Sequence, residues 1–142
     1  MAETRPTPGV GAVIVEDGRL LLIRRGRGAY QDYWAIPGGR QRRGETMREA
    51  VSREVREETG IADLEFAWGE ERYMETGPYS RGKTARYYLA STKQATVVMG
   101  PSPETGEPEH HEWRWVSFDE AYDLGSPRVR QIVQWARQII GT

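Results

Sequence analysis

Three glutamates close together in the sequence have a spacing that suits metal chemistry. Glu54, Glu57 and Glu58 are spaced i, i+3 and i+4, so on an α-helix they fall within an arc of roughly 100° on one face. Carboxylates that close repel one another, and nothing in folding rewards stacking them. A divalent cation such as Mg²⁺ does favour the arrangement, because it takes oxygen ligands, usually alongside waters and substrate phosphates. The spacing therefore fits a magnesium site.

The residues before and between these glutamates fit such a site. Arg53 lies i, i+4 from Glu57, where it can neutralise and orient that carboxylate. Glu45, at the mouth of the helix, favours the positive end of the helix dipole. The loop of residues 37–44 is rich in glycine, which lets backbone carbonyls and amides approach a metal and phosphates closely. Taken alone, the run REVREE is typical of a solvated helix face, but the loop and the upstream glutamate favour a site.

Residues 39–61, GRQRRGETMREAVSREVREETGI, resemble the Nudix box over its whole length. The fixed positions are Gly39, Glu45, Arg53-Glu54-Val55, Glu57-Glu58 and Gly60-Ile61, and none departs from the pattern. The resemblance implies a Nudix hydrolase, which cuts a nucleoside diphosphate linked to another moiety by in-line attack of water on phosphorus.

The same resemblance implies roles for individual residues. Glu54, Glu57, Glu58 and the backbone carbonyl of Gly39 would be metal ligands, with Mg²⁺ as the cofactor and Mn²⁺ as a possible substitute. Arg53 is counted with the catalytic residues. The general base is left open between Glu54, Glu58 and the downstream Glu109.

Outside the box, two segments resemble the diadenosine tetraphosphate hydrolase branch of the family. They are residues 83–90, KTARYYLA, and residues 109–115, EHHEWRW. The resemblance implies that Lys83 contacts a phosphate, that Tyr87 or Tyr88 stacks on a base, and that Glu109 lies near the metals. Arg40 is at best a partial stand-in for a lysine found ahead of the box in animal-type enzymes of this branch.

The two tyrosines are adjacent in a predicted strand, so they point to opposite faces and one is expected in the core. Tyr79, in a glycine-flanked loop, is an alternative residue for contacting a base. Trp113 and Trp115 share one strand face and are expected to pack under the last helix.

Other substrates and other functions stay open. Within the family the alternatives are ADP-ribose, a nucleoside diphosphate sugar or an oxidised nucleoside triphosphate. A non-catalytic nucleotide sensor would not need to retain three repelling carboxylates. Processing of mRNA 5′ ends would favour an extended basic surface, and although arginines gather in residues 24–43, acidic residues interrupt any long basic stripe.

The elements that must position these residues follow from apolar periodicity and from turn residues. Strands are predicted at residues 9–16, 20–25, 64–73, 83–91 and 113–116, with a tight turn at Asp17-Gly18 and a short apolar piece at 34–36. Helices are predicted at residues 46–59 and 117–122, and an amphipathic helix follows Pro127. We therefore expect a Nudix-type α/β/α sandwich with a mixed β-sheet, forming a single domain over residues 1–142.

The composition of the chain excludes several kinds of site and of partner. The chain has 142 residues, a net charge of −1 and no cysteine, which excludes disulfides, thiolate metal sites and cysteine nucleophiles. No apolar run approaches the roughly 20 residues that span a bilayer. We expect a cytoplasmic monomer or homodimer that acts on a small-molecule nucleotide, with neither a membrane nor duplex nucleic acid as a partner.

Overall fold

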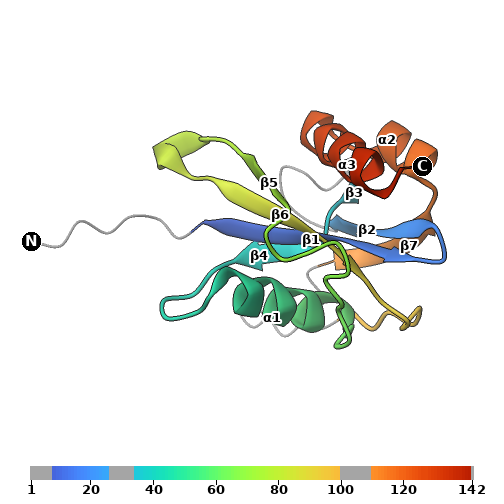
Figure 1. Ribbon diagram of the computed structural model, residues 1–142, viewed down its shortest axis with the longest axis horizontal. Coiled ribbons are helices and arrows are strands. Elements are labelled where there is room, and N and C mark those ends of the chain that lie inside the picture. Colours follow the sequence, from blue (N-terminus) through green and yellow to red (C-terminus); the bar gives the residue numbers. More distant parts are fainter. Residues whose placement is uncertain (1–7, 26–33, 100–109, 142) are drawn as a thin grey trace, which may run out of the picture.

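The computed structural model describes residues 8–25, 34–99 and 110–141, in which seven strands form one mixed sheet (Figure 1). The strands are β1 (Gly9–Glu16), β2 (Arg19–Arg25), β3 (Trp34–Ala35), β4 (Gly38–Arg40), β5 (Tyr73–Thr76), β6 (Ala85–Ser91) and β7 (His110–Val116). The helices are α1 (Met47–Thr59), the short 3₁₀ turn η1 (Ser80–Gly82), α2 (Phe118–Leu124) and α3 (Pro127–Ile140). Helix α1 covers one face of the sheet, and α2 and α3 cover the other. The expected α/β/α sandwich is confirmed.

Strand β1 is the centre of the sheet. It pairs antiparallel with β2 and β4 and parallel with β6. The link to β2 is the predicted tight turn, in which Asp17 and Gly18 both have positive φ, as a two-residue hairpin loop of this kind requires. A parallel pair needs a long crossover, and the chain between β1 and β6 supplies it and includes α1. The box is therefore fixed against the sheet by the topology.

Both faces of the sheet are buried, which explains why β1 is apolar along most of its length. Val13 and Val15 belong to the core beneath α2 and α3. Ala12 and Ile14 belong to a second core beneath α1. The predicted stripe of the last helix is confirmed, since its buried residues are Val129, Ile132, Val133 and Ala136. None of the described helices is long and apolar enough to cross a membrane.

The prediction of a strand over residues 64–73 is wrong. In this stretch only Glu65 forms a bridge, to Ser91, before β5 begins at Tyr73. Turns occupy the middle, where the Gly69 amide donates to the Phe66 carbonyl at 2.9 Å and Gly69 has a φ of 99°. Side chains from this segment still pack against the two cores. Its apolar pattern therefore indicates burial but not a strand.

The strand predicted at residues 113–116 is longer in the structure, where β7 spans His110–Val116. The expectation for its tryptophans is also wrong. Trp115 packs on the core beneath α1, where its indole nitrogen donates to the Ala95 carbonyl at 2.9 Å. Trp113 is 42% exposed. The face of β7 that carries Trp115 is directed toward α1. Strand alternation alone does not determine which face of a strand meets which helix.

Candidate active site

The helix that carries the three glutamates is capped at both ends. The Thr46 hydroxyl accepts from the Glu49 amide, and the Glu49 carboxylate accepts from the Thr46 amide, which is a complete capping box. Gly60 ends the helix in the left-handed conformation. Ala50, Val51 and Val55 are fully buried against the sheet. Capping and burial together fix the rotation of α1, so that the glutamate face is directed at the glycine loop.

Arg53 ties this helix to the loop before it. Its Nε and Nη2 donate to the two carboxylate oxygens of Glu45 at 2.7 and 3.0 Å, and Nη2 also donates to the Arg40 carbonyl at 2.8 Å. The Glu45 carboxylate accepts a further bond from the Arg42 amide at 2.7 Å. These hydrogen bonds, the one from Arg53 first, lower the pKa of Glu45 from 4.5 to about 2. Glu45 therefore stays ionised and holds the loop in place.

The three glutamates lie beside the same loop, as predicted. Glu54 accepts from Arg53 at 2.7 Å, and Glu57 accepts from the same guanidinium at 3.3 Å. Glu58 accepts from the Gly38 amide at 2.8 Å. The Glu54 carboxylate lies so close to Gly39 that a Cβ on that glycine would be 2.1 Å from a carboxylate oxygen. A side chain at position 39 would therefore force the Glu54 carboxylate to move.

The donor chemistry of this cluster fits a divalent cation. Carboxylates from one helix face and a loop without side chains are hard oxygen donors that can approach an ion closely. Within the described residues no group of three or more His, Asp or Glu side chains is already arranged to hold a metal. The reason is visible in the contacts above, since the glutamates are turned toward Arg53 and the Gly38 amide. The roles of Gly39, Glu54, Glu57 and Glu58 as ligands stay a prediction.

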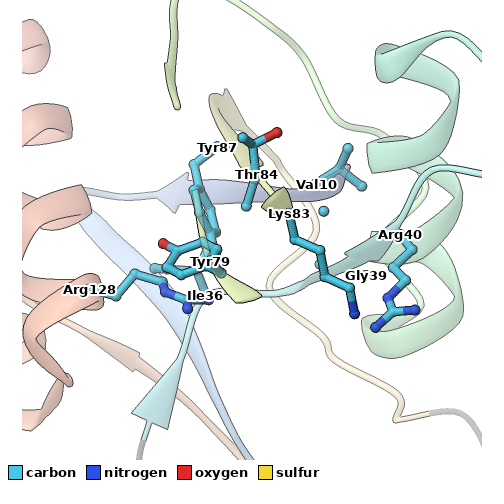
Figure 2. A pocket seen from close by; sticks show the side chains of 12 residues that line it. Val10, Ile36, Gly39, Arg40, Tyr79, Lys83, Thr84, Tyr87 and Arg128 are labelled. Carbon is cyan, nitrogen blue, oxygen red and sulfur yellow. The ribbon is translucent and has the colours of Figure 1, made fainter. Parts of the chain in front are cut away.

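A cavity of about 420 Å³ opens on the other side of the glycine loop (Figure 2). It is lined by Gly9, Val10, Ile36, Gly38, Gly39, Arg40, Tyr79, Lys83, Thr84, Ala85, Tyr87 and Arg128. Gly39 is shared between this cavity and the glutamate cluster. The described lining includes three cationic side chains and no acidic one. Its charge is opposite to that of the glutamate face and suits an anionic ligand.

The two ends of the cavity differ. Lys83 and Arg40 lie at the end near Gly39, whereas Tyr79, Tyr87 and Arg128 gather at the other end (Figure 2). One loop presents both Tyr79 and Lys83, because the Tyr79 amide donates to the Lys83 carbonyl at 2.6 Å. The cavity thus brings together Lys83, Tyr87 and Arg40, which were predicted to bind the substrate. It also includes Tyr79, the alternative residue for contacting a base.

A glycine in β1 makes room for Tyr87 at the aromatic end of the cavity. The Tyr87 ring covers Gly11 of β1, where an added Cβ would be 2.7 Å from a ring carbon. Burial raises the pKa of the Tyr87 phenol, and the charge of Arg128 partly opposes that rise. The phenol therefore stays protonated and keeps a hydrogen to donate.

Tyr88 does not join the cavity. It is 4% exposed and packs on the opposite face of the sheet, where its ring meets Phe66 edge-on at 6.1 Å. The expectation that one of the adjacent tyrosines belongs to the core is confirmed, and Tyr87 is the one that faces the cavity. Glu109, the third candidate base, lies outside the described residues.

Arg128 is the charged lining residue that sequence reasoning missed. It lies in the first turn of α3, and its guanidinium is 4.0 Å from the centroid of the Tyr79 ring. About fifty residues separate the two in the chain, and only the packing of α3 on the sheet brings them together. No local pattern around Arg128 indicates this contact.

The α/β/α sandwich sets a capped glutamate helix beside a glycine loop and a basic cavity. The NUDIX domain match and the hydrolase-named relatives make the chain a hydrolase acting on phosphorus-containing anhydrides. The chain belongs to the Nudix family, because the NUDIX domain model matches residues 5–136. Hydrolases of this family act on nucleotide substrates and generally use a divalent metal.

Two curated relatives and one solved structure illustrate the similarity. An ADP-ribose pyrophosphatase of Methanocaldococcus jannaschii is 43% identical over 56 residues, which are 39% of this chain and 33% of that protein. An RNA pyrophosphohydrolase of Teredinibacter turnerae is 32% identical over 78% of this chain and 71% of that protein. The crystal structure of a C. elegans Ap4A hydrolase binary complex superposes with a TM-score of 0.74 at 21% identity, covering 94% of this chain and 96% of that one.

Proposed function

We propose that this protein is a magnesium-dependent Nudix pyrophosphohydrolase whose substrate is a dinucleoside polyphosphate such as diadenosine tetraphosphate. One observation carries the proposal: the cavity that shares Gly39 with the glutamate helix is lined by Arg40, Lys83 and Arg128 without a described acidic residue. A long polyphosphate carries more negative charge than a diphosphate, so it gains more from cations beyond the metal site. Tyr79 and Tyr87 offer faces for a base at the far end of the same cavity.

The chain's own residues have separate tasks in this proposal. Glu54, Glu57, Glu58 and the Gly39 carbonyl hold the metal, which when bound polarises the phosphate oxygens and lowers the pKa of water. Arg53 restrains Glu54 and Glu57 and anchors the loop through Glu45. Lys83 and Arg40 bind and orient the phosphate chain near Gly39. The proton of the attacking water passes to a carboxylate, for which Glu54, Glu58 and Glu109 are the candidates.

Two other substrate classes have support from the relatives. The match to the ADP-ribose pyrophosphatase covers 39% of this chain, whereas the match to the RNA pyrophosphohydrolase covers 78%. The second favours RNA with a 5′ phosphate chain as the next candidate, because such an end is also polyanionic. ADP-ribose has only two phosphates and would leave part of the cationic lining without a partner.

A substrate panel tests the proposal. Diadenosine tetraphosphate, ADP-ribose, nucleoside triphosphates and 5′-triphosphorylated RNA are compared by kcat/KM with Mg²⁺ in ¹⁸O-labelled water. We expect diadenosine tetraphosphate to be cleaved faster than ADP-ribose, into ATP and AMP. Attack on the phosphorus fourth from the bound adenosine places the label in AMP. A higher kcat/KM for ADP-ribose or RNA, or two molecules of ADP as products, contradicts the substrate assignment, and full activity in excess EDTA contradicts the metal.

A further inference from the structure

The far end of the cavity offers hydrogen-bond donors in excess of acceptors. Its described side chains include the guanidinium of Arg128 and the phenols of Tyr79 and Tyr87. No carboxylate or carboxamide side chain is among the described lining residues. Two backbone carbonyls that border the cavity are already occupied, since Lys83 accepts from the Tyr79 amide and Thr84 accepts from the Gly9 amide at 2.8 Å. A ligand that presents hydrogen-bond acceptors therefore fits this end of the cavity best.

Arg128 is held in a position to use those donors. Its guanidinium stacks on Tyr79 at 4.0 Å, a contact that favours a planar cation over an aromatic face. No described carboxylate forms an ion pair with it. In the close view the guanidinium reaches from α3 toward the rings of Tyr79 and Tyr87 (Figure 2). Stacking on Tyr79 and a hydrogen bond to the Tyr87 phenol orient its planar fork of N–H groups, and the remaining N–H groups have no anionic partner among the described residues.

The purine bases differ at the edge that such a fork would meet. Guanine presents two adjacent acceptors, O6 and N7, which arginine contacts bidentately. Adenine presents N7 beside an N6 amino group, which is itself a donor and pairs instead with a carboxamide side chain. A donor-rich site without a carboxamide therefore discriminates between the two bases.

We propose that Arg128, stacked on Tyr79, is a specificity-determining residue that makes the base subsite of this cavity prefer guanine over adenine. The inference rests on the proposed function in that it assigns the cavity to a nucleotide. It adds that, among dinucleoside polyphosphates, those with guanine bind more tightly than diadenosine tetraphosphate. It does not depend on the length of the phosphate chain or on how that chain is cleaved.

The test is an equilibrium titration by calorimetry in EDTA, where hydrolysis does not interfere. Guanosine 5′-tetraphosphate and adenosine 5′-tetraphosphate are titrated into the wild-type chain, Arg128→Gln, Arg128→Lys and the control Arg130→Gln. Arg130 is a matched control, because it is also exposed on α3 but contacts Tyr122 and lies outside the cavity lining. Since Arg128 is exposed as well, we expect all variants to fold, and thermal unfolding verifies it.

We expect the wild type and Arg130→Gln to bind the guanosine ligand about tenfold more tightly than the adenosine ligand. In Arg128→Gln the preference should vanish or invert, because glutamine matches the adenine edge. Arg128→Lys should also lose it, since the charge remains but the fork does not. Equal wild-type affinities, or an adenosine preference, would overturn the proposal.

If Arg128 binds phosphate instead, Arg128→Gln weakens the binding of both ligands equally and leaves the ratio of their affinities unchanged. That result would also overturn the proposal. The outcome is separable from that of the substrate panel. A guanine preference that requires Arg128 supports this inference even in a protein that fails to cleave dinucleoside polyphosphates, a failure that would refute only the proposed function.

Discussion

The glutamate face of α1 and the cationic cavity meet at Gly39 but are built in opposite ways. The first gathers three carboxylates from five consecutive residues of one helix. The second gathers its cations from β4, from the residues just before β6 and from α3, without a described acidic residue in its lining. Like charges collected on either side are costly without a ligand. In the proposed function each region receives the counter-charge of its own ligand, which is a metal for the glutamate face and a phosphate chain for the cavity.

The largest effect is expected from removing a ligand charge on the acidic side. Glu57→Gln and Glu58→Gln keep the shape of the side chain but withdraw a negative charge, so turnover should fall by orders of magnitude. Initial rates with the best substrate of the panel measure this, and thermal unfolding should show little change. If both variants keep more than a tenth of the wild-type activity, the glutamate face is not the metal site of this enzyme.

A smaller loss is expected where the two regions touch. In Gly39→Ala the new Cβ would lie 2.1 Å from a Glu54 carboxylate oxygen, so Glu54 must turn away. A shift of about 1 Å in such a group can cost roughly a hundredfold in rate. Because the obstructing atom is the end of a flexible side chain, the variant should fold normally. Wild-type kcat/KM in this variant would show that the position of Glu54 is unimportant.

On the basic side the effect should depend on the substrate. Lys83→Ala should lower kcat/KM for diadenosine tetraphosphate by roughly tenfold, the value of one charge-assisted hydrogen bond, and should affect ADP-ribose less. The chain's other lysine, Lys93, is exposed and is not among the residues that line the cavity, so Lys93→Ala is a matched control. An equal loss for both substrates in Lys83→Ala would contradict the idea that this cation contacts only the longer chain.

The smallest effect concerns stability. The pKa of Glu45 is lowered from 4.5 to about 2 in the folded state, so its pairing with Arg53 stabilises the fold above pH 4.5. That contribution is lost as the pH falls from about 4.5 toward 2. Glu45→Gln should therefore be less stable than the wild type in urea unfolding at pH 7, and the difference should shrink at pH 3. A difference that is equal at both pH values would rule out this linkage.

The same contrast explains what could be predicted from the sequence. The glutamate face depends on spacing within one helix, so the positions of Glu54, Glu57 and Glu58 beside the glycine loop were predictable. Tyr87 was predictable only as one of two alternatives, because strand alternation does not determine which face meets the cavity. Arg128 was not predictable, since its contact with Tyr79 depends on how α3 packs across the sheet. The prediction of a strand over residues 64–73 failed because side chains buried from successive turns give the same apolar pattern as a strand.

The most direct test of the division between the two regions is metal binding itself. Mn²⁺ titrations followed by electron paramagnetic resonance, without nucleotide, compare the wild type with Glu57→Gln, Glu58→Gln and Lys83→Ala. We predict that each glutamine variant binds Mn²⁺ at least about tenfold more weakly, as loss of a charged ligand implies, and that Lys83→Ala binds it like the wild type. Unchanged Mn²⁺ affinity in both glutamine variants would contradict the assignment of the metal to the glutamate face of α1.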